Sequence, residues 1–157
     1  MFNGIQDKSL CTDDINVKVN YFSGAKVKDI KERLPDLLKD DKKTDFVVIN
    51  VGTNDEPQST SNKIVDGLLQ LKSEVKKFNP ESEVIISTPT TRTDNGKASY
   101  TLHKVNKHLN ELNVSIVDNT NIKAGDLGKK GLHLSKTGKG KLAKNVVSRL
   151  KQIVNSS

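Results

Sequence analysis

Three polar features of the sequence carry groups that could take part in acyl-transfer chemistry. The first is the turn Gly52-Thr53-Asn54-Asp55, which directly follows the apolar run 46–51. An Asn side chain in such a turn can direct its amide N–H groups at a developing oxyanion, and so can the open backbone N–H of a glycine. The other two features are Gly24 and His133, and histidine is the side chain that most often acts as a general base. These residue types together predict an oxyanion hole and a base.

Each of these residues also has a structural explanation. Gly52 could serve a tight turn, and Asn54 or Asp55 could cap the helix that follows. Gly24 could supply a positive φ angle. His133 lies between two leucines and could be a partly buried structural histidine. The functional interpretation therefore depends on a fold that brings the residues together.

The hydrophobic pattern predicts strands that alternate with helices. Alternating or continuous apolar residues predict strands over 15–22, 46–51, 83–87 and 114–117. Apolar residues at helical spacing predict four helices: one over 27–38 that Pro35 kinks or ends early, one from an N-cap at 59–61 to Asn79-Pro80, one containing Leu102–Leu112, and one containing Leu142–Ile153.

This order of elements predicts an α/β fold, a three-layer α/β/α sandwich with a parallel sheet, in one domain over residues 1–157. Ligand sites of open parallel sheets form where the carboxyl ends of the strands meet. We therefore expect Gly24, Asn54 and His133 to converge on that edge of the sheet.

Length and composition narrow the class of protein. A chain of 157 residues with 33% hydrophobic and 4% aromatic residues has the size of one domain with an aliphatic core. The single cysteine, Cys11, cannot form an internal disulfide, which favours an intracellular location over secretion. No apolar run reaches the length of a membrane helix, and the amino terminus lacks the pattern of a signal peptide.

The net charge of +7 is concentrated in the last quarter of the chain. Residues 121–157 hold nine Lys or Arg against one Asp, whereas residues 1–120 hold 17 basic and 18 acidic residues. We interpret this as a solvated helix face, and the alternative is a non-enzymatic module that binds nucleic acid or another polyanion. No aromatic residues alternate with the lysines to stack on bases, which weakens the alternative. Its binding residues would be Lys136, Lys139, Lys141, Lys144, Arg149 and Lys151.

The motifs and their order resemble those of the SGNH hydrolases, the GDSL esterase and lipase family. Gly24, in Tyr-Phe-Ser-Gly, matches the lone glycine of the second block, and Gly52–Asp55 matches the GxND block in full. Gly131–His133 and the residues up to Gly138 match the end of the DxxH block. The chain is also similar in style to SGNH-like domains in open reading frames of animal retroelements.

The resemblance implies a flavodoxin-like parallel sheet and hydrolysis of carboxylic esters through a serine acyl-enzyme, with no metal or other cofactor. It implies that Gly24 and Asn54 are the oxyanion donors and that His133 is the base. Gly52, Thr53 and Asp55 would form the supporting turn. The partner would be a small ester.

Two departures from the family pattern argue against activity. The Gly-Asp-Ser block with the nucleophile is absent, since Met1–Ile5 resembles the stretch just after that serine and Ser9, Ser23 and Ser87 match no nucleophile block. The Asp of DxxH is replaced by Lys130, which would disfavour a charged imidazole. Nearby carboxylates without the family spacing are Asp118 and Asp126.

We therefore predict an amino-terminally truncated SGNH-type domain that lacks its first strand and is inactive as written. A decayed gene product without a function of its own is a further interpretation. In the flavodoxin-like order the first strand would lie between segments 15–22 and 46–51. Without it, those two strands either pair with each other or keep unpaired edges.

Overall fold

The structure is a computed structural model that describes residues 10–12, 15–40, 43–55 and 59–156. Its elements, in chain order, are α2 (Val27–Leu38), β1 (Phe46–Asn50), α3 (Ser61–Phe78), β2 (Glu83–Ser87), α4 (Gly96–Glu111), β3 (Ile116–Val117), the 3-10 helix η1 (Ala124–Asp126) and α5 (Lys136–Asn155). The alternation of strands and helices predicted from the hydrophobic pattern is confirmed from β1 onward.

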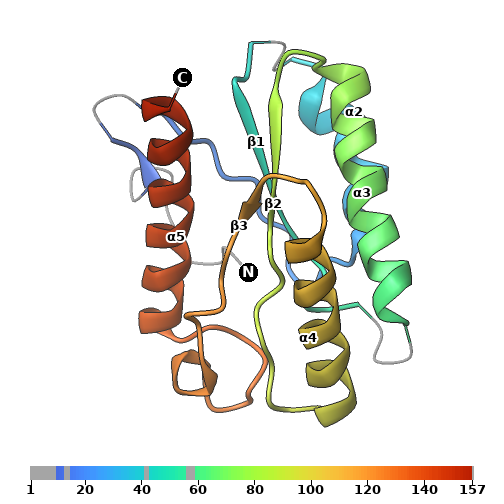
Figure 1. The fold of residues 1–157 in the computed structure, drawn as a ribbon, viewed down its shortest axis with the longest axis vertical. Coiled ribbons are helices and arrows are strands. Elements are labelled where there is room, and N and C mark those ends of the chain that lie inside the picture. The colour runs from blue at the N-terminus through green and yellow to red at the C-terminus, as the bar shows by residue number, and fades with distance from the viewer. Residues whose placement is uncertain (1–9, 13–14, 41–42, 56–58, 157) are drawn as a thin grey trace.

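The three strands form a parallel sheet in the order β1-β2-β3. Helices α2, α3 and α4 cover one face, and α5 covers the other (Figure 1). The predicted α/β architecture, a parallel sheet between helices, is therefore confirmed. The strands run downward in Figure 1, so their carboxyl ends meet near η1 and the segment 88–95.

The core is aliphatic, as the composition predicts. On one face of the sheet, the fully buried Leu68, Leu71 and Val75 of α3 pack with residues of α2, α4 and the strands. On the other face, Ile85 and residues of α5 form a second cluster. Full burial of one such side chain contributes about 1.5–3 kcal/mol, so the two clusters are the main source of stability.

The strand predicted over 15–22 is wrong. The alternation itself is present, because Ile15, Val17 and Val19 are half-buried in the cluster beside α5 while the residues between them are exposed. However, Ile15 exchanges backbone hydrogen bonds with Thr12, and Val17 N–H donates to Cys11 Sγ at 3.3 Å. Among the described residues this segment therefore forms no strand, and Ile15 and Val17 bond the nearby Thr12 and Cys11.

The strand predicted over 114–117 is shorter than expected. Val114 N–H donates to Leu112 O at 2.9 Å, in the turn that ends α4, so Val114 does not extend β3. In α2, the helix continues for three residues beyond Pro35, to Leu38.

Gly67 lets α2 approach α3. A Cβ at this position would lie 2.7 Å from Val27 Cγ1, whereas nothing lies within 4 Å of a Cβ at Gly140 in α5. A glycine in a helix normally costs about 0.5–1 kcal/mol relative to alanine. We expect Gly140→Ala to raise the free energy of unfolding by about this amount. Gly67→Ala should lower it by roughly 1–3 kcal/mol because the contact becomes overpacked.

Urea unfolding followed by circular dichroism measures both variants. The double variant Gly67→Ala/Val27→Ala should recover part of the loss, since it removes the methyl group that the new Cβ meets. Equal stabilisation by Gly67→Ala and Gly140→Ala would contradict this account of the helix contact.

Candidate active site

The Gly52–Asp55 turn follows β1 at the carboxyl edge of the sheet. Gly52 has a φ of +119°, and a Cβ there would lie 2.9 Å from Pro89 Cγ, so both conformation and space require glycine. Asp55 N–H donates to Gly52 O at 3.1 Å. Gly52 and Thr53 are buried and Asn54 is half-buried.

Asp55 connects this turn to the segment that contains Gly24. Its Oδ2 atom accepts a hydrogen bond from the backbone N–H of Val27, the first residue of α2, at 3.2 Å. Asp55 therefore binds the start of α2, whereas the cap of α3 is Thr60. Gly24 is exposed and has a φ of +66°, which confirms its predicted conformational role. Its role as an oxyanion donor stays a prediction.

The segment 88–95 joins the two motif-bearing loops. On one side, Thr53 Oγ1 donates to Thr90 O at 3.3 Å, and Arg92 donates to Thr53 O at 3.1 Å. On the other side, the backbone N–H groups of Thr93 and Asp94 donate to Gly131 O at 2.7 and 3.3 Å. This segment therefore holds the GxND turn and the histidine loop in one arrangement.

Arg92 and Asp94 form a two-pronged ion pair in this segment. Arg92 Nε donates to Asp94 Oδ1 at 2.7 Å, and its terminal nitrogen donates to Asp94 Oδ2 at 2.6 Å. These bonds raise the pKa of Arg92. The same bonds are the main reason that the pKa of Asp94 is lowered. Partial burial acts in the opposite direction, and the charge of His133 adds to the lowering. Sequence reasoning missed both residues, although an Arg-x-Asp triplet after a buried strand was visible.

His133 lies in a closed loop before α5. Gly128 N–H donates to His133 O at 2.7 Å, and Gly131 N–H donates to Gly128 O at 2.9 Å. Gly131 has a φ of +66°, and a Cβ there would clash with Thr93 Oγ1. His133 is exposed, so its interpretation as a partly buried structural residue is wrong. That Gly24, Asn54 and His133 meet on one substrate stays a prediction.

The two carboxylates suggested by sequence have other partners. Asp126 Oδ2 accepts bonds from Lys123 N–H at 2.9 Å and Lys141 Nζ at 2.7 Å. These bonds, that of Lys123 first, lower the pKa of Asp126. Asp118 is exposed and accepts from Thr120 N–H at 2.9 Å. Lys130, at the family's Asp position, is exposed.

Two of the three serines that match no nucleophile block lie within the described residues. Ser87 is fully buried, and its hydroxyl accepts bonds from the side-chain amides of Asn50 and Asn119 at 2.7 and 2.9 Å. Ser23 is exposed beside Gly24. Ser9 and the stretch Met1–Ile5 lie outside the described residues.

The family model of GDSL-like lipases and acylhydrolases matches residues 4–146 of this sequence. The chain belongs to the GDSL-like lipase/acylhydrolase family. This agrees with the motifs at Gly24, Gly52–Asp55 and His133. No curated protein matches the sequence significantly.

Solved structures with this fold include a carbohydrate esterase family 3 protein from Talaromyces cellulolyticus, with a TM-score of 0.71 and 17% identity over 93% of this chain and 79% of that one. An acetylxylan esterase variant from Geobacillus stearothermophilus aligns with a TM-score of 0.67 and 21% identity, over 87% and 72% of the two chains. An acetyl esterase variant with an acetate ion aligns with a TM-score of 0.70 and 20% identity, over 85% and 70%. At these identities the likeness shows the fold.

A groove in this GDSL-family domain borders the candidate site. It has a volume of about 300 Å³ and lies between α2 and α3, with Asp55 on its wall. Three lysines from the two helices line it, with apolar atoms of Val27 and Ile64 between them. Such a groove suits a ligand with an apolar part and a negative charge. The lysines are Lys28, Lys31 and Lys63.

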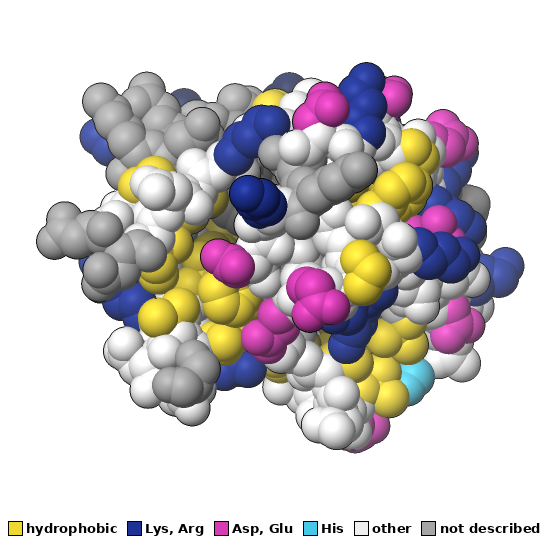
Figure 2. All heavy atoms as spheres, turned by 90° about the horizontal axis from the view of Figure 1, so that it is seen from above, with side chains coloured by type: hydrophobic (Ala, Val, Ile, Leu, Met, Phe, Trp, Pro, Cys, Tyr) yellow, Lys and Arg dark blue, Asp and Glu magenta, His cyan; other side chains and the backbone are white. Residues whose placement is uncertain are grey.

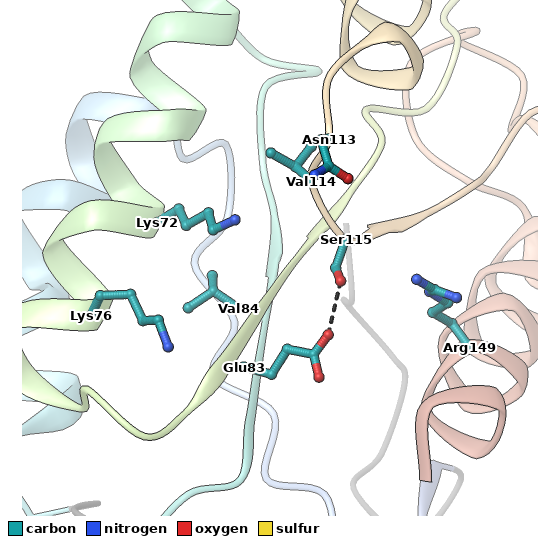
Figure 3. A pocket seen from close by; sticks show the side chains of 8 residues that line it. All are labelled: Lys72, Lys76, Glu83, Val84, Asn113, Val114, Ser115 and Arg149. Atoms are coloured by element: carbon teal, nitrogen blue, oxygen red, sulfur yellow. Dashed lines mark hydrogen bonds between the residues drawn. The ribbon is translucent and has the colours of Figure 1, made fainter. Parts of the chain in front are cut away.

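A second hollow lies at the other end of the sheet. Its volume is about 380 Å³, and Figure 3 shows Lys72 and Lys76 of α3 and Arg149 of α5 around Glu83, the first residue of β2. Glu83 accepts a hydrogen bond from Ser115 Oγ at 2.8 Å. Because it adjoins the amino end of β2, this hollow is separate from the site at the carboxyl ends.

Two of the basic side chains on the predicted face of α5 have partners within the protein. Lys141 forms its ion pair with Asp126, and Arg149 donates to Gln152 at 3.4 Å, whereas Lys136, Lys144 and Lys151 are exposed and Lys139 is half-buried. Figure 2, viewed from the upper end of Figure 1, shows basic and acidic side chains interspersed on that end. Binding of a polyanion by α5 stays a prediction.

Two further findings concern only the part of the chain that the structure describes. It contains no group of three or more His, Cys, Asp or Glu side chains that could hold a metal ion. None of its helices is long and apolar enough to cross a membrane.

Acid should weaken this fold through Asp94 and Asp126. Both carboxyl pKa values are lowered in the folded protein, so their contribution to stability is present above the unfolded value and is lost as the pH falls through the folded one. We expect the free energy of unfolding to decrease as the pH falls below about 4, the ordinary Asp value. Urea unfolding between pH 2 and pH 7 measures this, and Asp94→Asn and Asp126→Asn should each flatten the decrease. An undiminished decrease in both variants would be evidence against these pairs as its cause.

Proposed function

We propose that this chain is an SGNH/GDSL-type ester hydrolase domain in which Gly24 N–H and Asn54 donate to the oxyanion and His133 is the general base. The observation that carries the proposal is the set of contacts around segment 88–95. Through Thr90 and Arg92 it binds the Asn54 turn, and through Thr93 it binds the His133 loop. Family membership supports the same assignment.

The reaction follows from these roles. A serine hydroxyl attacks the ester carbonyl while His133 takes its proton, and the carbonyl oxygen becomes an oxyanion that Gly24 and Asn54 stabilise. The protonated His133 then gives its proton to the leaving alcohol, and water releases the acyl group by the same steps in reverse order. The 157 residues contain no Gly-Asp-Ser block, so we propose that the chain as printed binds esters without turning them over.

The structural relatives support small acyl esters as the first substrates to test. The names of two of them describe an acetyl esterase and an acetylxylan esterase. The groove beside Asp55, with three lysines against this one carboxylate, supports a preference for esters that carry a negative charge.

The chain as printed should hydrolyse p-nitrophenyl acetate no faster than its His133→Ala variant, because a base and oxyanion donors without a nucleophile form no acyl-enzyme. Stopped-flow absorbance of p-nitrophenol measures the rate, and mass spectrometry detects a bound acetyl group. A burst of p-nitrophenol with an acetylated serine, absent from the His133→Ala variant, would show that a serine of this chain is the nucleophile.

A chain that carries the family's Gly-Asp-Ser block ahead of Met1 should gain ester hydrolysis. In that chain Asn54→Ala should lower kcat by roughly 10²–10³, the effect of removing one oxyanion donor. The matched control is Asn62→Ala, which removes an exposed Asn from the first turn of α3. Equal kcat values for the two variants in an active, folded chain would remove Asn54 from the mechanism.

A further inference from the structure

The family's triad requires a carboxylate beside the histidine, and this chain has Lys130 at that position. A carboxylate there orients the imidazole and stabilises its charged form. Asp126 is bound by Lys123 and Lys141, and Asp118 is bound by the Thr120 backbone. A carboxylate that serves His133 would therefore have to come from a different loop.

Asp94 approaches the histidine loop from the segment after β2. Its backbone N–H donates to Gly131 O at 3.3 Å, two residues before His133, and Thr93 N–H bonds the same oxygen at 2.7 Å. Thr93 also fits so closely against Gly131 that no side chain could replace the glycine's hydrogen. The two loops are thus fixed against each other next to His133.

Arg92 fixes the Asp94 carboxylate without using all of its acceptor sites. Each carboxylate oxygen has two lone pairs, and Arg92 occupies one on each oxygen. The Arg92 side chain is 10% exposed and that of Asp94 is 28% exposed, so the carboxylate is the more accessible partner of the pair. The electrostatic interaction between His133 and Asp94, which lowers the pKa of Asp94, agrees with this placement.

We propose that Asp94, held by Arg92, is the positioning residue for His133 and takes the role of the missing DxxH aspartate. When His133 accepts the serine proton, Asp94 stays ionised and faces the new positive charge. Lys129 and Lys130 belong to the same loop as His133, and Arg92 holds Asp94. Among the described residues no hydrogen bond joins the Asp94 carboxylate to the His133 ring; catalytic hydrogen bonds in ligand-free proteins are often long, and they tighten when substrate binds. The inference rests on the proposed function for the role of His133 as a base, whereas the proposed interaction of Asp94 with His133 does not require ester hydrolysis.

The first test is an NMR titration of the Asp94 carboxyl carbon in the chain as printed. The pKa of Asp94 should rise in His133→Ala, and it should rise further in Arg92→Gln, because the Arg92 bonds are the larger cause of its lowering. The matched control is His103→Ala, which removes an exposed histidine from α4 and should leave the Asp94 titration unchanged. An Asp94 titration that is the same in wild type and His133→Ala overturns the proposal.

The second test is the tautomer of His133, read from the nitrogen-15 shifts of its ring. In the wild type the ring should carry its proton on Nδ1, toward Asp94, and keep Nε2 free to accept a proton from serine. Asp94→Ala should lose this preference, Asp94→Glu should retain part of it, and the control Asp118→Ala should retain all of it. The same tautomer in wild type and Asp94→Ala overturns the proposal even if the titration shows coupling.

These measurements separate this inference from the proposed function, because neither needs ester turnover. In an active chain that carries the Gly-Asp-Ser block, Asp94→Asn should lower kcat with little change in KM, by up to about 10⁴-fold as for the triad Asp of a serine protease. Lys130→Asp should then add little. If Asn54→Ala lowers kcat and Asp94→Asn does not, the positioning role is wrong and the esterase function stands.

Discussion

The candidate site depends on one buried guanidinium. Arg92 as a whole residue is 8% exposed, and a charged group in such a position needs both a counter-charge and partners for its remaining hydrogens. Asp94 supplies the counter-charge, and the carbonyl of Thr53 accepts a further bond. The Asp94 side of the pair is partly exposed, but its two short hydrogen bonds and the bond to Thr53 favour one conformation of the loop. Because the same loop binds Gly131, the conformation of the histidine loop depends on Arg92 as well.

A layer of amides supports this loop from within the sheet. Ser87, at the end of β2, accepts bonds from Asn50 of β1 and from Asn119 after β3. Asn119 also donates to Thr88 O at 2.8 Å and accepts from Asn145 of α5 at 2.9 Å. Asn50 interrupts an otherwise apolar strand, and this network is the physical reason for its presence. Polar side chains thus replace aliphatic packing where the sheet must present loops to solvent.

The sequence alone predicted those helices and strands whose apolar residues follow a clear helical or strand pattern. Helix α3 has five buried apolar residues on one face and a Thr60 cap, and β2 is a continuous apolar run, so both could be read directly. Segment 15–22 shows the limit of this reasoning. Its alternation determines which side chains are buried, and the structure agrees, but pairing depends on a neighbouring strand that alternation does not specify. In the described residues the segment packs beside α5, and Ile15 and Val17 bond Thr12 and Cys11.

The residues of the candidate site also fall into those that the sequence could predict and those that it could not. Gly52 and Gly131 could be found from the family motifs. Their positive φ angles and close neighbours require glycine, so these positions are visible in the sequence. Asp126 is the carboxylate closest in sequence to the family's Asp position. It binds Lys141 of α5, 15 residues away in the chain, so sequence distance did not identify a partner for His133. Asp94 is distant from His133 in sequence, and only the pairing of two loops through Gly131 brings it near. A triad depends on where its charged groups lie in space, so a carboxylate from a different loop can take the place of the motif's aspartate only if its backbone is fixed beside the histidine, as the backbone of Asp94 is fixed to Gly131.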